Sequence, residues 1–203
     1  MFAVLKMPFF RNTSLKPTLL LGLFALKIAM ATAYGYIHFH YFYGGDTWAF
    51  LHNSCLIYES LFINPLYYLE LTFLPNARKP PEYLYDIIYP IAGWNDIRTY
   101  TIYRINAILH LISGGYYYVH AVFFAFFSYV GSIALYRTFV NYFPERGKRL
   151  LIILFAIPTI VFWSSGIHKE AVTLFCLGLI FFHFQQLLYK KQQRKRIIFL
   201  LLL

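Results

Sequence analysis

The chain has 203 residues, of which 60% are hydrophobic, 22% aromatic and only 13% charged. Soluble domains carry about 25% charged residues, so this composition excludes a soluble globular domain. It also excludes a disordered chain, a collagen-like repeat and a disulfide scaffold, because hydrophobicity is high and 11 Gly and 2 Cys are too few. The class that remains is an integral membrane protein.

The net charge of +10 does not indicate nucleic-acid binding, because the basic residues lie beside apolar runs and no nucleic-acid recognition motif accompanies them. Basic clusters at the edges of membrane spans attract anionic lipid headgroups and fix the orientation of the chain. We therefore expect the lipid bilayer as a partner and no nucleic acid.

Apolar runs of about 20 residues are long enough to cross the hydrocarbon layer as helices. The sequence contains four such runs and the start of a fifth, at about 18–39, 116–139, 150–163, 167–189 and 197–203. Pro158 bends or shortens the third run, and the last run is too short to span, so the sequence looks truncated. The predicted fold is all-α, a single polytopic bundle of transmembrane helices.

Basic residues gather in segments 6–16, 137–149 and 190–196, whereas most acidic residues lie between the first two full spans. Short loops rich in Lys and Arg stay in the cytoplasm. We therefore expect a multi-pass protein with a cytoplasmic N-terminus and a long outer loop at about 44–112.

The outer loop opens with a predicted helix from Asp46 to Phe62, which follows the Gly44-Gly45 turn and ends at Asn64-Pro65. At about 100° per residue, five polar side chains fall in one arc: Asp46, His52, Asn53, Glu59 and Ser60. An apolar stripe opposes them: Trp48, Leu51, Cys55, Tyr58 and Phe62. This pattern predicts an amphipathic helix that rests at the membrane interface.

A second helical piece is expected from Asp96 to Ile112, leading into the Gly114-Gly115 break. It carries Arg98, Arg104 and His110 among apolar residues. The pattern fits an interfacial helix or a re-entrant half-span, and the sequence leaves both open.

Three ionisable residues, His168, Lys169 and Glu170, begin the fourth expected span. Charges beside hydrocarbon are costly without partners or water. The first N–H groups of a helix are unpaired and carry the positive end of its dipole, so an anion such as phosphate is favoured beside Lys169. The simpler alternative is that these charges mark only where a helix enters the membrane.

Two other charged residues each have a functional and a structural interpretation. Asp46 is a candidate for chemistry, and it is also well placed to cap the N-terminus of its helix. Lys27 lies inside the first expected span, where a charge indicates function by default, although a structural ion pair or a path of its side chain to the cytoplasmic edge explains it as well. His38 and His40 fall on different sides of a helix, so no metal site is predicted from them.

Two motifs carry a resemblance to a known family. The first is Gly45-Asp46-Thr47-Trp48, an acidic residue at the start of an interfacial helix after the first span. The second is segment 157–170, IPTIVFWSSGIHKE. It is similar to the Pro-Ser-x-x-Phe-Trp-Ser-Ser-Gly-x-x-Lys-Glu/Asp segments of bacterial polytopic polysaccharide-assembly proteins. Together the motifs resemble the N-terminal module of the GT-C superfamily of membrane glycosyltransferases, which implies a bacterial inner (plasma) membrane.

The resemblance implies transfer of a sugar from a polyprenyl-phosphate-linked donor, with inversion, at the outer membrane face. Asp46 would be the catalytic base that deprotonates the acceptor hydroxyl. Lys169, with His168 and Arg104, would neutralise the departing lipid phosphate, and Glu170 would complete the substrate-binding set. No second acid lies beside Asp46 in the sequence, so no cofactor is predicted, although some relatives use a divalent metal.

Two further classes of function stay open. The chain is also compatible with a transport-like bundle, in which Lys27, Lys169 and Glu170 line a path. It is equally compatible with a non-catalytic membrane subunit or fragment that packs its aromatic surfaces against a membrane protein partner. Whether the chain is an enzyme is not decided by its sequence.

Overall fold

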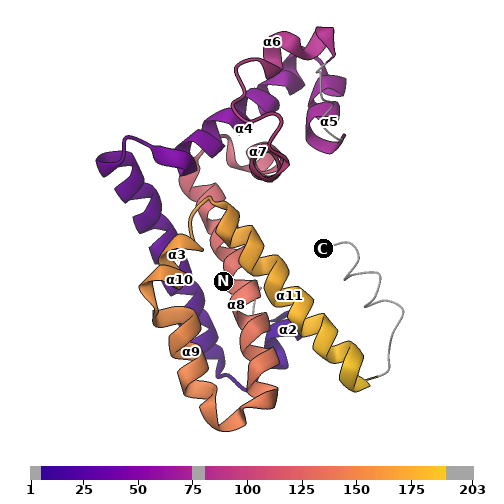
Figure 1. Cartoon of the computed structure of the whole chain (residues 1–203). Coiled ribbons are helices and arrows are strands. Elements are labelled where there is room, and N and C mark those ends of the chain that lie inside the picture. Colours follow the sequence, from indigo (N-terminus) through magenta and orange to yellow (C-terminus); the bar gives the residue numbers. More distant parts are fainter. Residues whose placement is uncertain (1–5, 75–80, 191–203) are drawn as a thin grey trace.

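The computed structural model describes residues 6–74 and 81–190, and all regular structure in these ranges is helical, as the all-α prediction requires (Figure 1). The elements in chain order are α2 (Pro8–Arg11), α3 (Pro17–Tyr41), α4 (Gly45–Ile63), α5 (Pro65–Phe73), η1 (Glu82–Leu84), α6 (Tyr85–Ile88), α7 (Ile97–Ser113), α8 (Tyr117–Tyr142), η2 (Pro144–Arg146), α9 (Gly147–Ala156), α10 (Pro158–Trp163) and α11 (Lys169–Lys190). The fifth run expected at 197–203, and the basic residues 191–196, lie outside the described residues.

Three helices in the described part of the chain are long and apolar enough to cross a membrane: Pro17–Tyr41, Tyr117–Tyr142 and Lys169–Leu188. They correspond to the first, second and fourth expected spans. The third expected span, 150–163, is divided between α9 and α10, of 10 and 6 residues. The break falls at Ile157, whose extended backbone (φ −73°, ψ 116°) is the conformation that a following proline imposes.

Helix α8 lies at the centre of the bundle and packs against both α3 and α11. The contact with α11 is between backbones. A Cβ on Gly131 would overlap the backbone of Leu174, and a Cβ on Gly178 would overlap the backbone of Gly131. Two glycines that face each other therefore bring the helices closer than side chains would allow.

The bundle has two unlike ends (Figure 1). One end, here called the loop end, carries α4 to α7, where α3 finishes and where α8 and α11 begin. The opposite end, here called the basic end, carries the start of α3, the η2 turn and the last turns of α11. The described basic segment 137–149, expected in the cytoplasm, and the acidic loop, expected outside, thus fall at opposite ends of one bundle.

Helices α4, α5 and α7 form a small layer at the loop end, and α4 packs most closely on α7. The polar arc predicted for α4 is only partly exposed. Asn53 and Ser60, two of its five members, are buried, whereas Phe62 of the apolar stripe is 73% exposed and free to contact a membrane. Asn53 is satisfied inside the layer, because its side chain donates to Ala49 O and accepts from Ala92 N.

The two turns that end α4 and α7 were predicted correctly. Helix α4 ends at Ile63, and the Asn64 side chain caps α5 by accepting the Leu66 N–H. Helix α7 ends at Ser113, followed by Gly114 in the left-handed region (φ 59°).

Candidate functional site

The centre of the candidate site is a cavity of about 380 Å³ at the loop end, here called the Asp46 cavity. It is formed by the end of α3, the start of α4 and the chain between α10 and α11. Its lining residues are Tyr34, His38, Phe42, Gly45, Asp46, Phe162, Trp163 and His168. Aromatic walls with a few polar groups are typical of a ligand site, and this volume falls in the usual range.

Asp46 lies in the first turn of α4 and faces His168 across the cavity, with 3.9 Å between Asp46 Oδ2 and His168 Nε2. Its side chain is 80% exposed. The expected capping role of Asp46 is not observed, since the N-cap residue of α4 is Gly44 and the helix has no side-chain hydrogen bond at its cap. The carboxylate is therefore open to a ligand.

The neighbours of Asp46 hold the start of α4 against the bundle. Thr47 Oγ1 and Tyr117 Oη share a 2.6 Å hydrogen bond. Trp48 donates its indole N–H to Gly35 O at 3.1 Å and stacks on Tyr117 with ring centroids 4.1 Å apart. Because these partners come from α3 and α8, the position of Asp46 is set by both of these helices.

His168 connects the cavity to Glu170. Its Nδ1 pairs with Glu170 Oε2, while its Nε2 points toward Asp46. Burial lowers the pKa of His168 below its usual 6.5, and Asp46 opposes that shift only in part. Burial therefore favours the neutral ring, with Nδ1 directed toward Glu170 and Nε2 directed toward the cavity.

The turn that carries His168 is fixed by a close contact with α3. A Cβ on Gly166 would overlap the ring of Tyr34, so this position requires glycine. The Tyr34 ring also contacts Trp163 and His168, with centroids 5.8 Å and 6.2 Å apart. The Ser164-Ser165-Gly166 sequence thus forms a tight turn against α3.

Lys169 follows His168 but faces the other side of α11. Its Nζ lies 3.6 Å from Asp96 Oδ2 and 5.8 Å from the centre of the Phe50 ring, a ring that also contacts His168. Asp96 is also paired with Arg98, whose Nε lies 3.3 Å from Asp96 Oδ1. Lys169 and Arg98 both line a groove of about 370 Å³ between α7 and α11, here called the α7/α11 groove.

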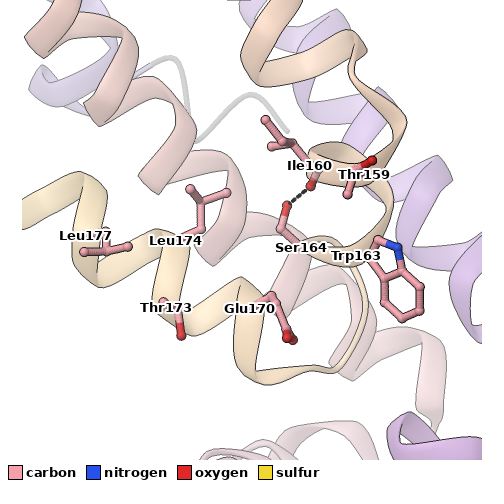
Figure 2. Close-up of a pocket in the computed structure, with 8 residues that line it drawn as sticks. All are labelled: Thr159, Ile160, Trp163, Ser164, Glu170, Thr173, Leu174 and Leu177. Carbon is pink, nitrogen blue, oxygen red and sulfur yellow. Dashed lines mark hydrogen bonds between the residues drawn. The ribbon is translucent and has the colours of Figure 1, made fainter.

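Glu170 lines a second groove of about 340 Å³, between α10 and α11, here called the α10/α11 groove (Figure 2). Trp163, Ser164 and Thr173 line it as well, and Ser164 Oγ donates to Ile160 O at 2.5 Å. Trp163 lines this groove and the Asp46 cavity. Trp163 therefore borders both spaces.

Arg104 is a residue of α7, and its guanidinium group lies against the carboxyl end of α5. Its Nε donates to Leu71 O at 3.3 Å, its Nη2 donates to Leu74 O, and its guanidinium lies 4.9 Å from the centre of the Tyr100 ring. A cation that pairs with the last carbonyl groups of a helix stabilises that helix end, so the role of Arg104 here is structural. The expected binding residues are thus distributed over four places, and Asp46 and His168 share one of them.

Lys27 is fully buried in the bundle and forms a cluster with two serines. Its Nζ donates to Ser128 Oγ at 2.7 Å and to Ser164 Oγ at 2.8 Å, and the two hydroxyls are 3.0 Å apart. The structural alternative for Lys27 was an ion pair, but the partners are hydroxyls from α8 and from the residue after α10. Lys27 therefore joins three elements directly behind the α10/α11 groove.

A second buried cluster joins α7 to α8. His120 Nδ1 donates to Asn106 Oδ1 at 2.7 Å, and His120 Nε2 accepts from Ser113 Oγ at 2.6 Å. Asn106 Nδ2 donates to Ile102 O, which leaves Oδ1 as the acceptor and fixes the tautomer of His120. The order resembles a nucleophile, base and orienting group, but Ser113 is only 6% exposed and the network is a packing element.

The part of the chain that the structure describes holds no group of three or more His, Cys, Asp or Glu side chains that would hold a metal ion. Asp46 has His168 beside it, a pairing that suits proton transfer better than metal ligation.

The sequence reasoning did not identify Tyr34, His38, Trp163 or Arg98 as site residues. His38 was considered only with His40, yet its Nδ1 donates to Tyr34 O at 2.9 Å and its ring lines the cavity. A usable signal existed in the spacing of Tyr34 and His38, which places both on one face of α3 four residues apart.

Comparison of the chain with protein family models, curated protein sequences and solved structures finds no match.

Proposed function

We propose that the chain is a membrane-embedded glycosyltransferase module of the GT-C type, working at the outer face of a bacterial inner membrane. In this proposal α3, α8 and α11 cross the bilayer with the basic end in the cytoplasm, and the layer of α4 to α7 lies at the outer interface. The separation of basic and acidic segments to opposite ends of the bundle supports this placement.

The observation that carries the proposal is the pair formed by Asp46 and His168, 3.9 Å apart in one cavity of about 380 Å³. The exposed Asp46 carboxylate is the general base. It takes the proton of an acceptor hydroxyl, whose oxygen bonds to the anomeric carbon of the sugar while the bond to the donor phosphate breaks. The electron pair of that bond leaves with the phosphate.

The leaving phosphate gains negative charge in this step, so cations near it lower the barrier. Lys169 begins α11 immediately after His168, where the unpaired N–H groups of the helix also favour an anion. His168, neutral at rest, becomes a second cation if it takes up a proton, and Glu170 on its Nδ1 stabilises that form. The donor is a sugar linked to a polyprenyl phosphate.

The test is a transfer assay with the full chain in membrane vesicles, a polyprenyl-phosphate-linked radiolabelled sugar and host glycan acceptors. Asp46→Asn is expected to lower transfer by about 10² to 10⁴-fold, since proton transfer by a positioned base contributes that much. Glu59→Gln, which alters another exposed acid of α4, serves as the matched control. Transfer that survives Asp46→Asn unchanged would remove Asp46 from the mechanism and leave a non-catalytic membrane subunit.

The placement has its own test, independent of chemistry. In a chain carrying Cys55→Ser and Cys176→Ser, single cysteines are introduced at Tyr89, which is 77% exposed at the loop end, and at the exposed Lys148 near the basic end. A membrane-impermeant maleimide added to intact cells is expected to label the cysteine at position 89 and not that at 148. The reverse pattern would invert the topology, and labelling of both would contradict a membrane-spanning bundle.

A further inference from the structure

Helix α11 presents a ridge with a groove on each side. Thr173 and Leu177 form the ridge, because they line both the α7/α11 groove and the α10/α11 groove. Leu177 is 45% exposed, so the crest of the ridge is open to the surroundings. The grooves are similar in size, about 370 Å³ and about 340 Å³.

The walls of the two grooves are suited to hydrocarbon. Val172, Cys176 and Ile180 follow one another at four-residue spacing along the α7/α11 groove. Ile160 and Leu174 line the other (Figure 2). From Lys169 to Ile180 the helix rises by roughly 16 Å, at about 1.5 Å per residue. The α7/α11 groove follows the helix over this length, and the α10/α11 groove follows its other flank from Glu170 to Leu177, roughly 10 Å.

The upper ends of the grooves carry opposite charges. On the α7 side, Asp96 holds Arg98 and Lys169 beside each other, which leaves one net positive charge. On the α10 side, Glu170 provides a negative charge. Burial lowers the pKa of His168, so its neutral ring does not cancel that charge.

We propose that a two-chain phospholipid with an amine in its headgroup straddles α11, with one acyl chain in each groove. Its phosphate lies beside Arg98 and Lys169, and its ammonium lies beside Glu170. The inference rests on the membrane placement proposed above, but it does not depend on glycosyl transfer.

The number of chains and the kind of headgroup both follow from this geometry. The two grooves are similar in size and lie on either side of one ridge, which matches the two acyl chains of a phospholipid that are attached to one glycerol. The local charges sum to zero across the ridge, with the positive and negative ends on opposite sides, which is the arrangement of a zwitterionic headgroup. Trp163, 47% exposed beside Glu170, adds an aromatic face that attracts an ammonium.

The proposed sugar donor and the phospholipid would share Lys169. The two ligands are therefore expected to compete, and the phospholipid would occupy the ridge while no donor is bound. Because lipid retention is measured without donor, its outcome is separate from that of the transfer assay.

The first experiment is native mass spectrometry of the full chain purified in mild detergent from membranes of mixed phospholipids. The expected result is one retained two-chain phospholipid per chain. Arg98→Gln with Lys169→Gln is expected to lower the retained fraction about fivefold, since each exposed ion pair contributes modestly. The control is Lys148→Gln with Arg149→Gln, two exposed cations at the basic end. Equal retention in both double variants would overturn the proposal.

The ridge itself is tested with a matched pair on one helix. Leu177→Asp places a carboxylate between the two chains and is expected to abolish retention. Leu188→Asp places it at a more exposed position, 63% exposed, at the far end of α11 and is expected to leave retention unchanged. Equal losses in the two variants would show that the lipid is not held at the ridge.

The headgroup is tested on the unaltered chain in nanodiscs. Equal amounts of phosphatidylethanolamine, phosphatidylglycerol and phosphatidylcholine are offered, and the retained lipid is identified. Phosphatidylethanolamine is expected to exceed phosphatidylglycerol by about threefold, and Glu170→Gln is expected to remove that preference. Preference for phosphatidylglycerol, retention of a single-chain lipid phosphate in its place, or retention of no lipid would each overturn the proposal.

Discussion

Lys27 and Lys169 place the same ammonium group in two different surroundings. Lys27 is fully buried and donates to the hydroxyls of Ser128 and Ser164. Lys169 has a side chain that is 36% exposed, pairs with Asp96 at 3.6 Å and borders a groove. A buried charge persists only where fixed partners satisfy it, so those partners leave no room for a ligand. A half-exposed charge keeps one side available, and function is expected there.

The largest effect is expected from a variant that tests whether the hydroxyls of Ser128 and Ser164 stabilise the buried ammonium of Lys27. Replacing both Ser128 and Ser164 by Ala leaves the ammonium without these acceptors, and a loss of about 3 kcal/mol in unfolding free energy is expected. Adding Lys27→Met to that double variant is expected to recover most of the loss, since the charge is removed with its partners. Denaturant unfolding of the detergent-solubilised chain measures both. Failure of Lys27→Met to recover stability would mean that the serines act by packing alone.

A smaller effect is expected from the buried histidine cluster. Asn106→Leu removes the oxygen that accepts the His120 Nδ1–H at 2.7 Å and is expected to cost about 2 kcal/mol, the desolvation penalty of an unpaired donor. Thermal unfolding followed by near-ultraviolet circular dichroism measures the loss. Asn141→Leu, on the exposed end of α8, is the comparison variant. A similar loss of stability in both variants would show that the histidine cluster stabilises the fold no more than Asn141 does.

The smallest expected effect is a pH dependence of stability that comes from His110, a buried histidine of α7 at the loop end. Burial lowers the pKa of His110 below its usual 6.5, although Glu59 opposes the shift. The unfolded chain therefore binds more protons below about pH 6.5, and stability falls as the pH falls through that value toward the folded pKa. Tyr58, stacked on the ring, and His120, 4.6 Å from it, are the other titratable neighbours.

Unfolding measured at about pH 7, pH 6 and pH 5 is expected to show an unfolding free energy that decreases as the pH falls, with a contribution from His110. His110→Gln is expected to flatten this part of the curve. An unchanged slope in that variant would assign the pH dependence to other groups, such as His168 at the loop end.

The helix boundaries could be predicted because local residues set them. Asn64-Pro65, Gly114-Gly115 and Pro158 each end or break a helix for reasons that act within a few residues. Composition was equally informative, because a chain with so little charge has few soluble alternatives.

The partners of buried groups could not be predicted. Lys27 lies 101 and 137 residues from the serines that it contacts, and no periodicity links such positions. The buried face of α4 was misassigned for the same reason, since α7 covers the side that carries Asn53 and Ser60. The hydrogen bonds from Arg104 to the carbonyls of Leu71 and Leu74 likewise depend on how α7 packs on α5, which no local sequence pattern indicates.

Lys169 and Glu170 are adjacent in the sequence yet border different grooves, because successive helix positions are rotated by about 100°. The sign of the charge on each flank is therefore set by the rotational phase of the helix. Inserting a single alanine ahead of Thr173 would turn the cation and the anion together relative to the rest of α11. That insertion would redirect both charges while leaving composition almost unchanged, so at this place the spacing of residues carries as much information as their identity.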